Sequence, residues 1–134
     1  MATLVDYNMR GMPRRGEIWM VNFGETFTDV LPDCATIRGR RPAVIVQTRV
    51  IWDGRLLVTV IPITSFKHGR PPRFTEGGDQ IVIAPPEGGV TMASTTTAQI
   101  LTVDRRQLAR RCGSLYAGTM ARIDGLLATA VGLP

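Results

Sequence analysis

Two short stretches of the sequence put residues capable of phosphate chemistry at the ends of neighbouring apolar segments. Arg41 precedes the apolar segment 43–48, and Thr64 follows the apolar segment 56–63. An Asp-Gly pair at 53–54 is typical of a hairpin turn, so the two segments are expected to form antiparallel strands. The start of one strand then lies beside the end of the other. A guanidinium and a hydroxyl are therefore expected to meet at one edge of a sheet.

Further polar and basic residues surround this edge. Ser65 adds a second hydroxyl after Thr64, and the loops that frame the edge, 24–40 and 66–78, are basic. The basic residues that these loops contribute are Arg38, Arg40, Lys67, Arg70 and Arg73. A guanidinium is a planar fork that matches phosphate oxygens two at a time. The pattern favours a groove for a polyanion, with a fixed cation and hydroxyl donors at its base.

Phosphodiester cleavage is the chemistry that such a groove suits. Negative charge grows on the non-bridging oxygens in the transition state, and a preorganised arginine can stabilise that charge. RNA supplies its own nucleophile, the 2′-hydroxyl, so neither a metal nor a protein nucleophile is strictly required. His68 is the only histidine, and no four-ligand zinc set is present. We therefore expect no metal and no cofactor. Spacing alone also leaves open a solvated loop at 38–41 and a strand that simply ends at 64–65.

Composition limits the class of protein. The chain has 134 residues, of which 44% are hydrophobic and 20% charged, which predicts one globular domain. The net charge of +5 points weakly to a nucleic-acid partner. Every basic residue except Lys67 is an arginine, and codon usage explains this bias as well as phosphate binding does. No apolar run approaches the roughly 20 residues that span a bilayer, and no signal peptide is apparent, so we expect a cytoplasmic protein without a membrane segment. Cys34 and Cys112 show no CxxC spacing and are expected to be free thiols.

The remaining pattern predicts the elements that position these residues. Residues 1–12 are expected to form a flexible leader, and residues 13–134 a single domain. Short strands are expected at 18–23, 43–48, 56–63, 80–84 and 91–103. The threonines at 94–97 are interpreted as β-propensity on a half-exposed strand. Such a sheet tends to curl and close, which removes its free edges.

Helices are expected at the C-terminal end of the chain. Asp104 is a suitable N-cap for a short helix over 105–111, and Gly113 is expected to end it. Apolar residues at helical spacing predict a second helix within 115–131. The fold class predicted is therefore mainly β, a small antiparallel barrel with C-terminal helices.

Four segments together resemble the MazF/PemK toxin family. They are RRGEIWMVNF (14–23), GRRPAVIVQ (39–47), VTVIPITS (58–65) and TTAQILTVDRRQL (96–108). The distinctive features are an RGEIW-like start, an Arg-Pro before an apolar strand, a strand that ends in P-x-T-S, and the AQI-x-T-V-D pattern. The resemblance runs from about residue 14 to residue 131 and implies the SH3-like barrel that MazF, Kid and CcdB toxins share.

The resemblance also implies an activity and partners. It implies the toxin of a type II toxin–antitoxin system, a homodimer that cuts single-stranded mRNA at short motifs without a metal. The expected products carry a 2′,3′-cyclic phosphate and a 5′-hydroxyl. The expected protein partner is a cognate acidic antitoxin, partly disordered until it blocks the groove.

Individual site residues follow from the same resemblance. The family's catalytic arginine falls on Arg41, its catalytic threonine on Thr64, and its RNA-contacting glutamine on Gln99. Further substrate contacts are expected from Arg38, Arg40, Ser65, Lys67 and Arg70. Because a guanidinium is a poor general base, Arg41 is expected to stabilise phosphate charge, with proton donation to the leaving 5′-oxygen as a second role left open. Thr64 is expected to hydrogen-bond the scissile phosphate.

The sequence departs from the family pattern at three places, and two other functions stay open. Ala98 stands where many members have an acidic residue, the 24–40 loop is long, and residues 1–12 have no counterpart. A CcdB-like gyrase poison is one alternative, although this chain ends in AVGLP where those toxins have a tryptophan-containing tail. A non-catalytic nucleic-acid-binding barrel is the other, and only a measurement of activity separates it from a nuclease.

Overall fold

Seven strands and one α-helix make up the part of the chain that the computed structural model describes, residues 11–24, 39–66, 81–96 and 99–133. The strands are β1 (Glu17–Asn22), β2 (Arg40–Trp52), β3 (Arg55–Ser65), β4 (Val82–Ile83), β5 (Ser94–Thr96), β6 (Leu101–Asp104) and β7 (Leu108–Ser114). Two 3₁₀ turns, η3 (Glu87–Gly89) and η4 (Arg105–Gln107), precede the helix α1 (Ala117–Ala130). No helix among these residues is long and apolar enough to cross a membrane.

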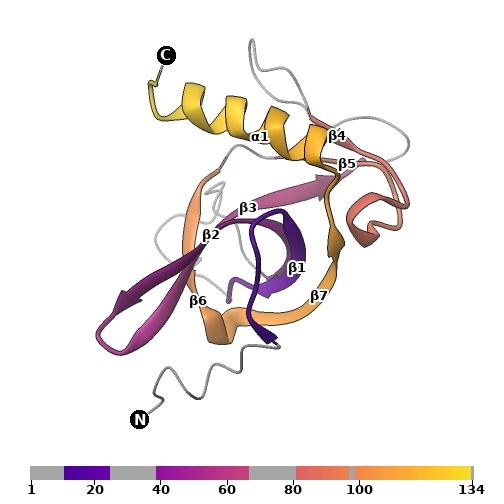
Figure 1. The fold of residues 1–134 in the computed structure, drawn as a ribbon. Helices are drawn as coiled ribbons and strands as arrows, with labels where there is room; N and C mark the ends of the chain where they lie inside the picture. Colours follow the sequence, from indigo (N-terminus) through magenta and orange to yellow (C-terminus); the bar gives the residue numbers. More distant parts are fainter. Residues whose placement is uncertain (1–10, 25–38, 67–80, 97–98, 134) are drawn as a thin grey trace, which may run out of the picture.

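The strands form one antiparallel sheet that curls on itself. The strand order is β4-β5-β3-β2-β1-β7, and β6 pairs with the other end of β3. The chain passes from β6 through η4 directly into β7, so the paired strands β6, β3, β2, β1 and β7 surround a common centre, while α1 lies outside the curl (Figure 1). The predicted mainly-β, antiparallel barrel is confirmed. The prediction of more than one C-terminal helix is wrong, because the described residues contain α1 alone.

The β2–β3 hairpin is the central element, as its turn signal predicted. Trp52 pairs with Arg55 around the two-residue turn at 53–54. Asp53 and Gly54 have positive φ angles of 52° and 72°, the backbone that a primed hairpin turn requires. The register shifts between Ile45 and Gln47 and again between Gln47 and Val50, so the turn pairs the two strands while these irregularities set the register at the other end of the hairpin.

Two hydrophobic cores lie on opposite faces of the central strands. The inner core, inside the curl, consists of Trp19, Val21, Ala43, Ile45, Val58, Val60, Val103 and Leu108. The outer core, which α1 covers, consists of Ile18, Val44, Ile61, Ile63, Ile81, Ile83 and Ile123. Burial on both faces explains why β2 and β3 have continuous apolar runs instead of alternating polar and apolar residues.

The buried carboxylate of Glu17 connects the start of β1 to β7. Its Oε1 accepts hydrogen bonds from the backbone N–H of Arg14 at 2.6 Å and from the indole Nε1 of Trp19 at 3.1 Å. Its Oε2 lies 2.6 Å from Nε of Arg111. The glutamate of the RGEIW segment is therefore a structural anchor for the barrel.

The turn around η3 sets the position of α1. A Cβ at Gly89, where φ is +73°, would lie 2.1 Å from the backbone oxygen of Cys112, so the turn and β7 touch backbone to backbone. The Glu87 carboxylate accepts a hydrogen bond of 2.8 Å from the backbone N–H of Tyr116, the N-cap of α1. An acidic group at a helix N-terminus is electrostatically favourable.

Two predicted elements differ from the structure. Asp104 caps a turn as expected, since it accepts a hydrogen bond from the Arg106 N–H at 2.9 Å and Gln107 bonds back to it. The turn ends after η4, however, and Leu108–Ser114 forms β7, which pairs with β1 where a helix was expected. The strand expected at 91–103 is two separate strands, β5 and β6.

Several predictions concern residues at the margin of the described part. Residues 1–10 of the predicted leader and Cys34 lie outside the described residues. The carbonyl of Gly11 accepts a hydrogen bond from the guanidinium of Arg105. Cys112 is a half-buried free thiol, as predicted.

Candidate functional site

Arg41 of β2 and Thr64 of β3 lie at the same end of the β2–β3 hairpin. Ala43 pairs with Pro62 and Val44 pairs with Ile61. Arg41 is two residues before Ala43 and Thr64 is two residues after Pro62, so continuing this register would set them opposite each other, and both are half-buried. The two residues therefore occupy the same edge of the sheet, as the sequence predicted, while their catalytic roles stay a prediction.

Arg41 and Thr64 extend the face of the inner core. Directly opposite residues of an antiparallel pair point to the same side, and alternate residues along a strand share a face. Arg41 is paired with Val21 of β1 and is two residues before Ala43 in β2. Val21 and Ala43 both belong to the inner core, so Arg41 lies on the same face. The guanidinium and the hydroxyl thus lie at the rim of the curl, where the inner core ends.

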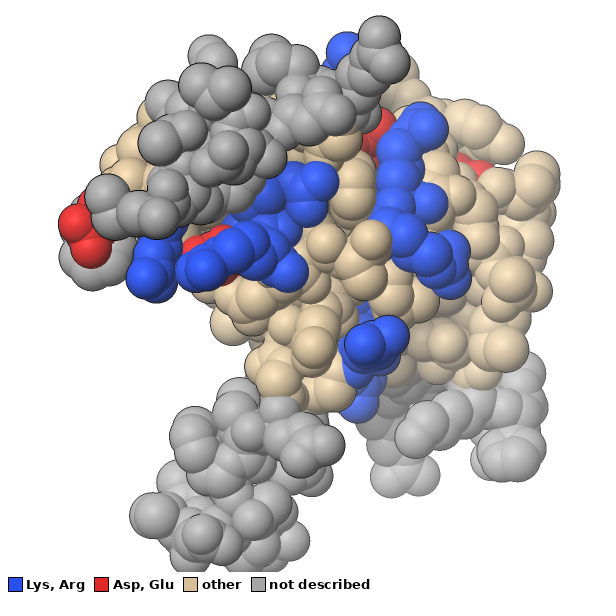
Figure 2. All heavy atoms as spheres, turned by 90° about the horizontal axis from the view of Figure 1, so that it is seen from below, with Lys and Arg blue, Asp and Glu red and all other residues tan. Residues whose placement is uncertain are grey.

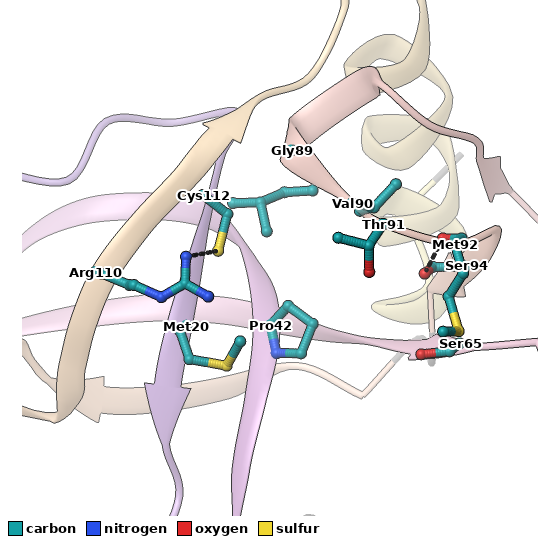
Figure 3. A pocket seen from close by; sticks show the side chains of 11 residues that line it. Met20, Pro42, Ser65, Gly89, Val90, Thr91, Met92, Ser94, Arg110 and Cys112 are labelled. Carbon is teal, nitrogen blue, oxygen red and sulfur yellow. Dashed lines mark hydrogen bonds between the residues drawn. The ribbon is translucent and has the colours of Figure 1, made fainter.

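Ser65 and Arg40 are adjacent in sequence to Thr64 and Arg41, respectively, so they lie on the opposite, outer face of the sheet. Arg40 is exposed and pairs with Asn22 of β1. Ser65 is exposed and, with Pro42 and Met20, lines a shallow hollow on that face (Figure 3). Ser65 thus ends the same strand as Thr64 but presents its hydroxyl to the opposite side of the sheet.

The hollow is small and open to the surface. Its volume is about 120 Å³, whereas sites for drug-sized ligands occupy roughly 300–1,000 Å³. Flexible side chains line much of it, and the Arg110 guanidinium lies 3.8 Å from the sulfur of Cys112 beside it (Figure 3). The hollow offers room for a single side chain or a few ligand atoms and forms no enclosed pocket.

The short strand β5 adds a row of buried hydroxyls that sequence reasoning misjudged. Ser94, Thr95 and Thr96 are all buried, so the predicted half-exposed strand is wrong. Thr95 pairs with Thr64, and within the described residues its hydroxyl oxygen has no hydrogen-bond partner. A run of small polar residues looks like a surface strand in the sequence, and only the pairing with β3 and β4 reveals its burial.

The remaining predicted contacts are spread around the molecule or lie outside the described residues. Gln99 is exposed in the short connection that leads to β6. The loop residues Arg38, Lys67, Arg70 and Arg73 lie outside the described residues. On the face that Figure 2 shows, basic side chains gather in separate groups with uncharged surface between them, and few acidic side chains are visible.

Four further arginines in η4 and β7 escaped the sequence analysis, and all four have partners within the fold. Arg105 lies over the Trp19 ring, 5.0 Å from its centroid, and Arg111 pairs with Glu17. Arg106 forms a bidentate pair with Asp104, and its hydrogen bond holds the pKa of that carboxyl below the usual value. Arg110 is exposed on the outer face opposite Met20. The Arg-Arg pairs at 105–106 and 110–111 are the feature of the sequence that could have drawn attention to these residues.

No metal centre is formed by the part of the chain that the structure describes. No group of three histidine, cysteine, aspartate or glutamate residues gathers there. The polar groups at the rim of the curl are a guanidinium and hydroxyls, which bind and polarise anions through charge-assisted hydrogen bonds.

Comparison with known proteins identifies the family. Residues 14–131 match the family described as PemK-like, MazF-like toxin of type II toxin-antitoxin system. Because the match covers most of the chain, the protein belongs to this family of toxins.

Solved structures with the same fold support the assignment. An endoribonuclease from a mycobacterial species, in complex with its cognate antitoxin, is 20% identical with a TM-score of 0.61, over 92% of this chain and 96% of that chain. The Mycobacterium tuberculosis toxin MazF-mt6 is 18% identical with a TM-score of 0.61, over 88% of this chain and 98% of that chain. MazF from Deinococcus radiodurans is 20% identical with a TM-score of 0.62, over 91% of this chain and 98% of that chain. At these identities the likeness establishes the fold.

Proposed function

We propose that this toxin is a metal-independent, sequence-specific endoribonuclease that cleaves single-stranded mRNA. The products are a 2′,3′-cyclic phosphate on one fragment and a 5′-hydroxyl on the other. The observation that carries the proposal is that Arg41 and Thr64 lie at the same end of the β2–β3 hairpin, each two residues beyond the Ala43–Pro62 pair. A similar structure from a mycobacterial species is an endoribonuclease, which supports the same activity here.

The reaction is an internal transesterification at phosphorus. The RNA 2′-oxygen forms a bond to phosphorus, the bond to the 5′-oxygen breaks, and a proton moves from the 2′-hydroxyl to the leaving 5′-oxygen. The guanidinium of Arg41 stabilises the charge that grows on the non-bridging oxygens. Thr64 donates a hydrogen bond to one of these oxygens. Loss of one such preorganised donor costs about 2.7–4 kcal/mol of barrier, or about 10²–10³ in rate.

Two protein partners complete the proposal. A cognate antitoxin with an acidic segment would occupy the same rim and exclude RNA, since the chain carries a net charge of +5. Complexes of similar toxins with antitoxins support this partner. A second copy of the chain is the other partner, so the active form is a homodimer.

End mapping of a cleaved RNA tests the proposal. Purified protein is incubated with a long single-stranded RNA in EDTA, alongside Arg41→Ala and the control Arg122→Ala, which removes an exposed arginine from α1. We expect discrete fragments with 5′-hydroxyl ends from the native protein and the control, and a loss of about 10²–10³ in rate from Arg41→Ala. Intact RNA across several substrates, or cleavage that survives Arg41→Ala, contradicts the proposal. Binding without cleavage supports the non-catalytic barrel instead.

A further inference from the structure

Thr95 carries a buried hydroxyl that the fold does not use. The side chain is 0% exposed, and within the described residues its Oγ1 has no hydrogen-bond partner. Buried polar atoms are nearly always paired, so an unpaired one in a native structure calls for an explanation. A valine has almost the same shape without the polar atom, so packing alone does not explain a threonine here.

The position of Thr95 suggests what the hydroxyl does. In the β3–β5 pair, Thr95 is directly opposite Thr64, while Ile63 is opposite Thr96 and Ser65 is opposite Ser94. Directly opposite residues share a face, so Thr95 lies on the face of Thr64, and its neighbour Thr96 lies on the face of the outer core. The Cβ atoms of such a pair are about 4.5–5.5 Å apart, a separation at which two threonine hydroxyls can hydrogen-bond.

We propose that Thr95 is a positioning residue that orients the Thr64 hydroxyl toward the scissile phosphate. The inference rests on the proposed function of Thr64. Because Thr95 is fully buried, it does not touch RNA and acts through Thr64. A hydroxyl has one proton to donate and two lone pairs to accept with. When the Thr95 O–H donates to Thr64 Oγ1, the single Thr64 proton is directed to the phosphate oxygen.

The hydrogen bond from Thr95 to Thr64 also strengthens the hydrogen bond that Thr64 donates to the phosphate. Each hydrogen bond in a chain polarises the next, most effectively where water is excluded. The Thr64 side chain is half-buried, and χ1 of a threonine has staggered alternatives, so in this proposal a bound phosphate selects the rotamer in which both bonds form. Thr95 is thus expected to affect the chemical step more than the affinity for RNA.

Matched substitutions in β5 test the proposal by kcat and KM under single-turnover and steady-state conditions. Thr95→Val removes the hydroxyl and keeps the shape, Thr95→Ser keeps the hydroxyl, and Thr96→Val makes the same change on the opposite face. We expect Thr95→Val to lower kcat about tenfold, the effect of one net hydrogen bond, with KM within about twofold. Thr95→Ser and Thr96→Val are expected to retain kcat within about threefold. Thermal melting of Thr95→Val is expected at or above that of the native protein.

A double-mutant cycle separates positioning from a general packing effect. In a Thr64→Val background, Thr95→Val has nothing left to orient, so no further loss is expected. An equal loss in both backgrounds, an equal loss from Thr95→Ser, or a lower melting temperature for Thr95→Val would overturn the inference. If the native protein cleaves RNA and Thr95→Val matches it, the inference fails while the proposed function stands. If the native protein does not cleave RNA at all, the proposed function itself has failed.

Discussion

Removal of the Glu17 carboxylate is expected to destabilise the barrel by about 3 kcal/mol. Glu17→Ala deletes the acceptor for the Trp19 indole, which is buried and cannot turn to water, so that donor loses its partner at a cost of about 1–3 kcal/mol. The hydrogen bond from the Arg14 amide, at 2.6 Å to a charged acceptor, adds about 1–2 kcal/mol. The Arg111 side chain is 53% exposed and rehydrates, so the ion pair contributes at most about 1 kcal/mol.

Glu17→Gln and Arg111→Ala separate these contributions. A glutamine retains an oxygen for Arg14 and Trp19, both of which bond to Oε1, and turns an NH₂ toward Arg111. Glu17→Gln and Arg111→Ala are therefore each expected to cost about 1 kcal/mol, a third of the effect of alanine. Urea unfolding at a constant m-value measures all three. A Glu17→Gln protein as unstable as Glu17→Ala, or an alanine variant within about 1 kcal/mol of the native protein, would refute the assigned roles of the two oxygens.

Three further predictions concern the turn, the cap and the basic surface. Gly89→Ala is expected to abolish stable folding or cost more than about 3 kcal/mol, because its Cβ would lie 2.1 Å from the Cys112 backbone oxygen. The control Gly54→Ala has a similar φ but open space around the Cβ, and it is expected to cost only about 1 kcal/mol. Urea unfolding measures both. The pKa of Asp104 is lowered from 3.8 in the folded protein, chiefly by the hydrogen bond from Arg106. The carboxylate therefore contributes its full stabilisation well above pH 3.8, and this stabilisation is lost as the pH falls through the lowered pKa of the folded state. Melting temperatures from pH 6 to pH 2 should show this loss in the native protein, and Asp104→Asn, which can still cap the turn, should show a smaller one. RNA binding is expected to weaken steeply with salt as phosphate contacts release counterions, and a flat salt dependence in a filter-binding assay would contradict a phosphate-binding rim.

Local signals in the sequence were sufficient to predict the hairpin and its consequence. The Asp-Gly turn makes β2 and β3 antiparallel neighbours, which brings Arg41 and Thr64 to the same end of the hairpin. Their exact alignment depends on two register shifts along β2, which the turn signal does not predict. No knowledge of distant parts of the chain is needed to predict that shared end, since in an antiparallel hairpin the start of one strand lies beside the end of the other.

Predictions that depended on tertiary context failed. Asp104 and Gln107 form a true capping box, but a cap fixes only the first turn. The residues that follow gain more from pairing with β1 than from helix formation, and tertiary pairing overrides local propensity. The burial of Ser94–Thr96 was missed for a related reason, because hydroxyl-bearing strands are usually exposed and their cover comes from other segments.

The two candidate catalytic residues differ from loop-borne active sites in how their backbone is held. Arg41 lies on β2, which is paired with β1 on one side and β3 on the other, and Thr64 lies on β3 between β2 and β5. Neither strand is an edge, and both faces of each are buried nearby. Their Cα positions are consequently fixed before any phosphate arrives, which lowers the reorganisation that a transition state requires. It follows that substitutions in β1 or β5 that loosen this pairing should reduce the rate of cleavage even though their side chains never contact RNA.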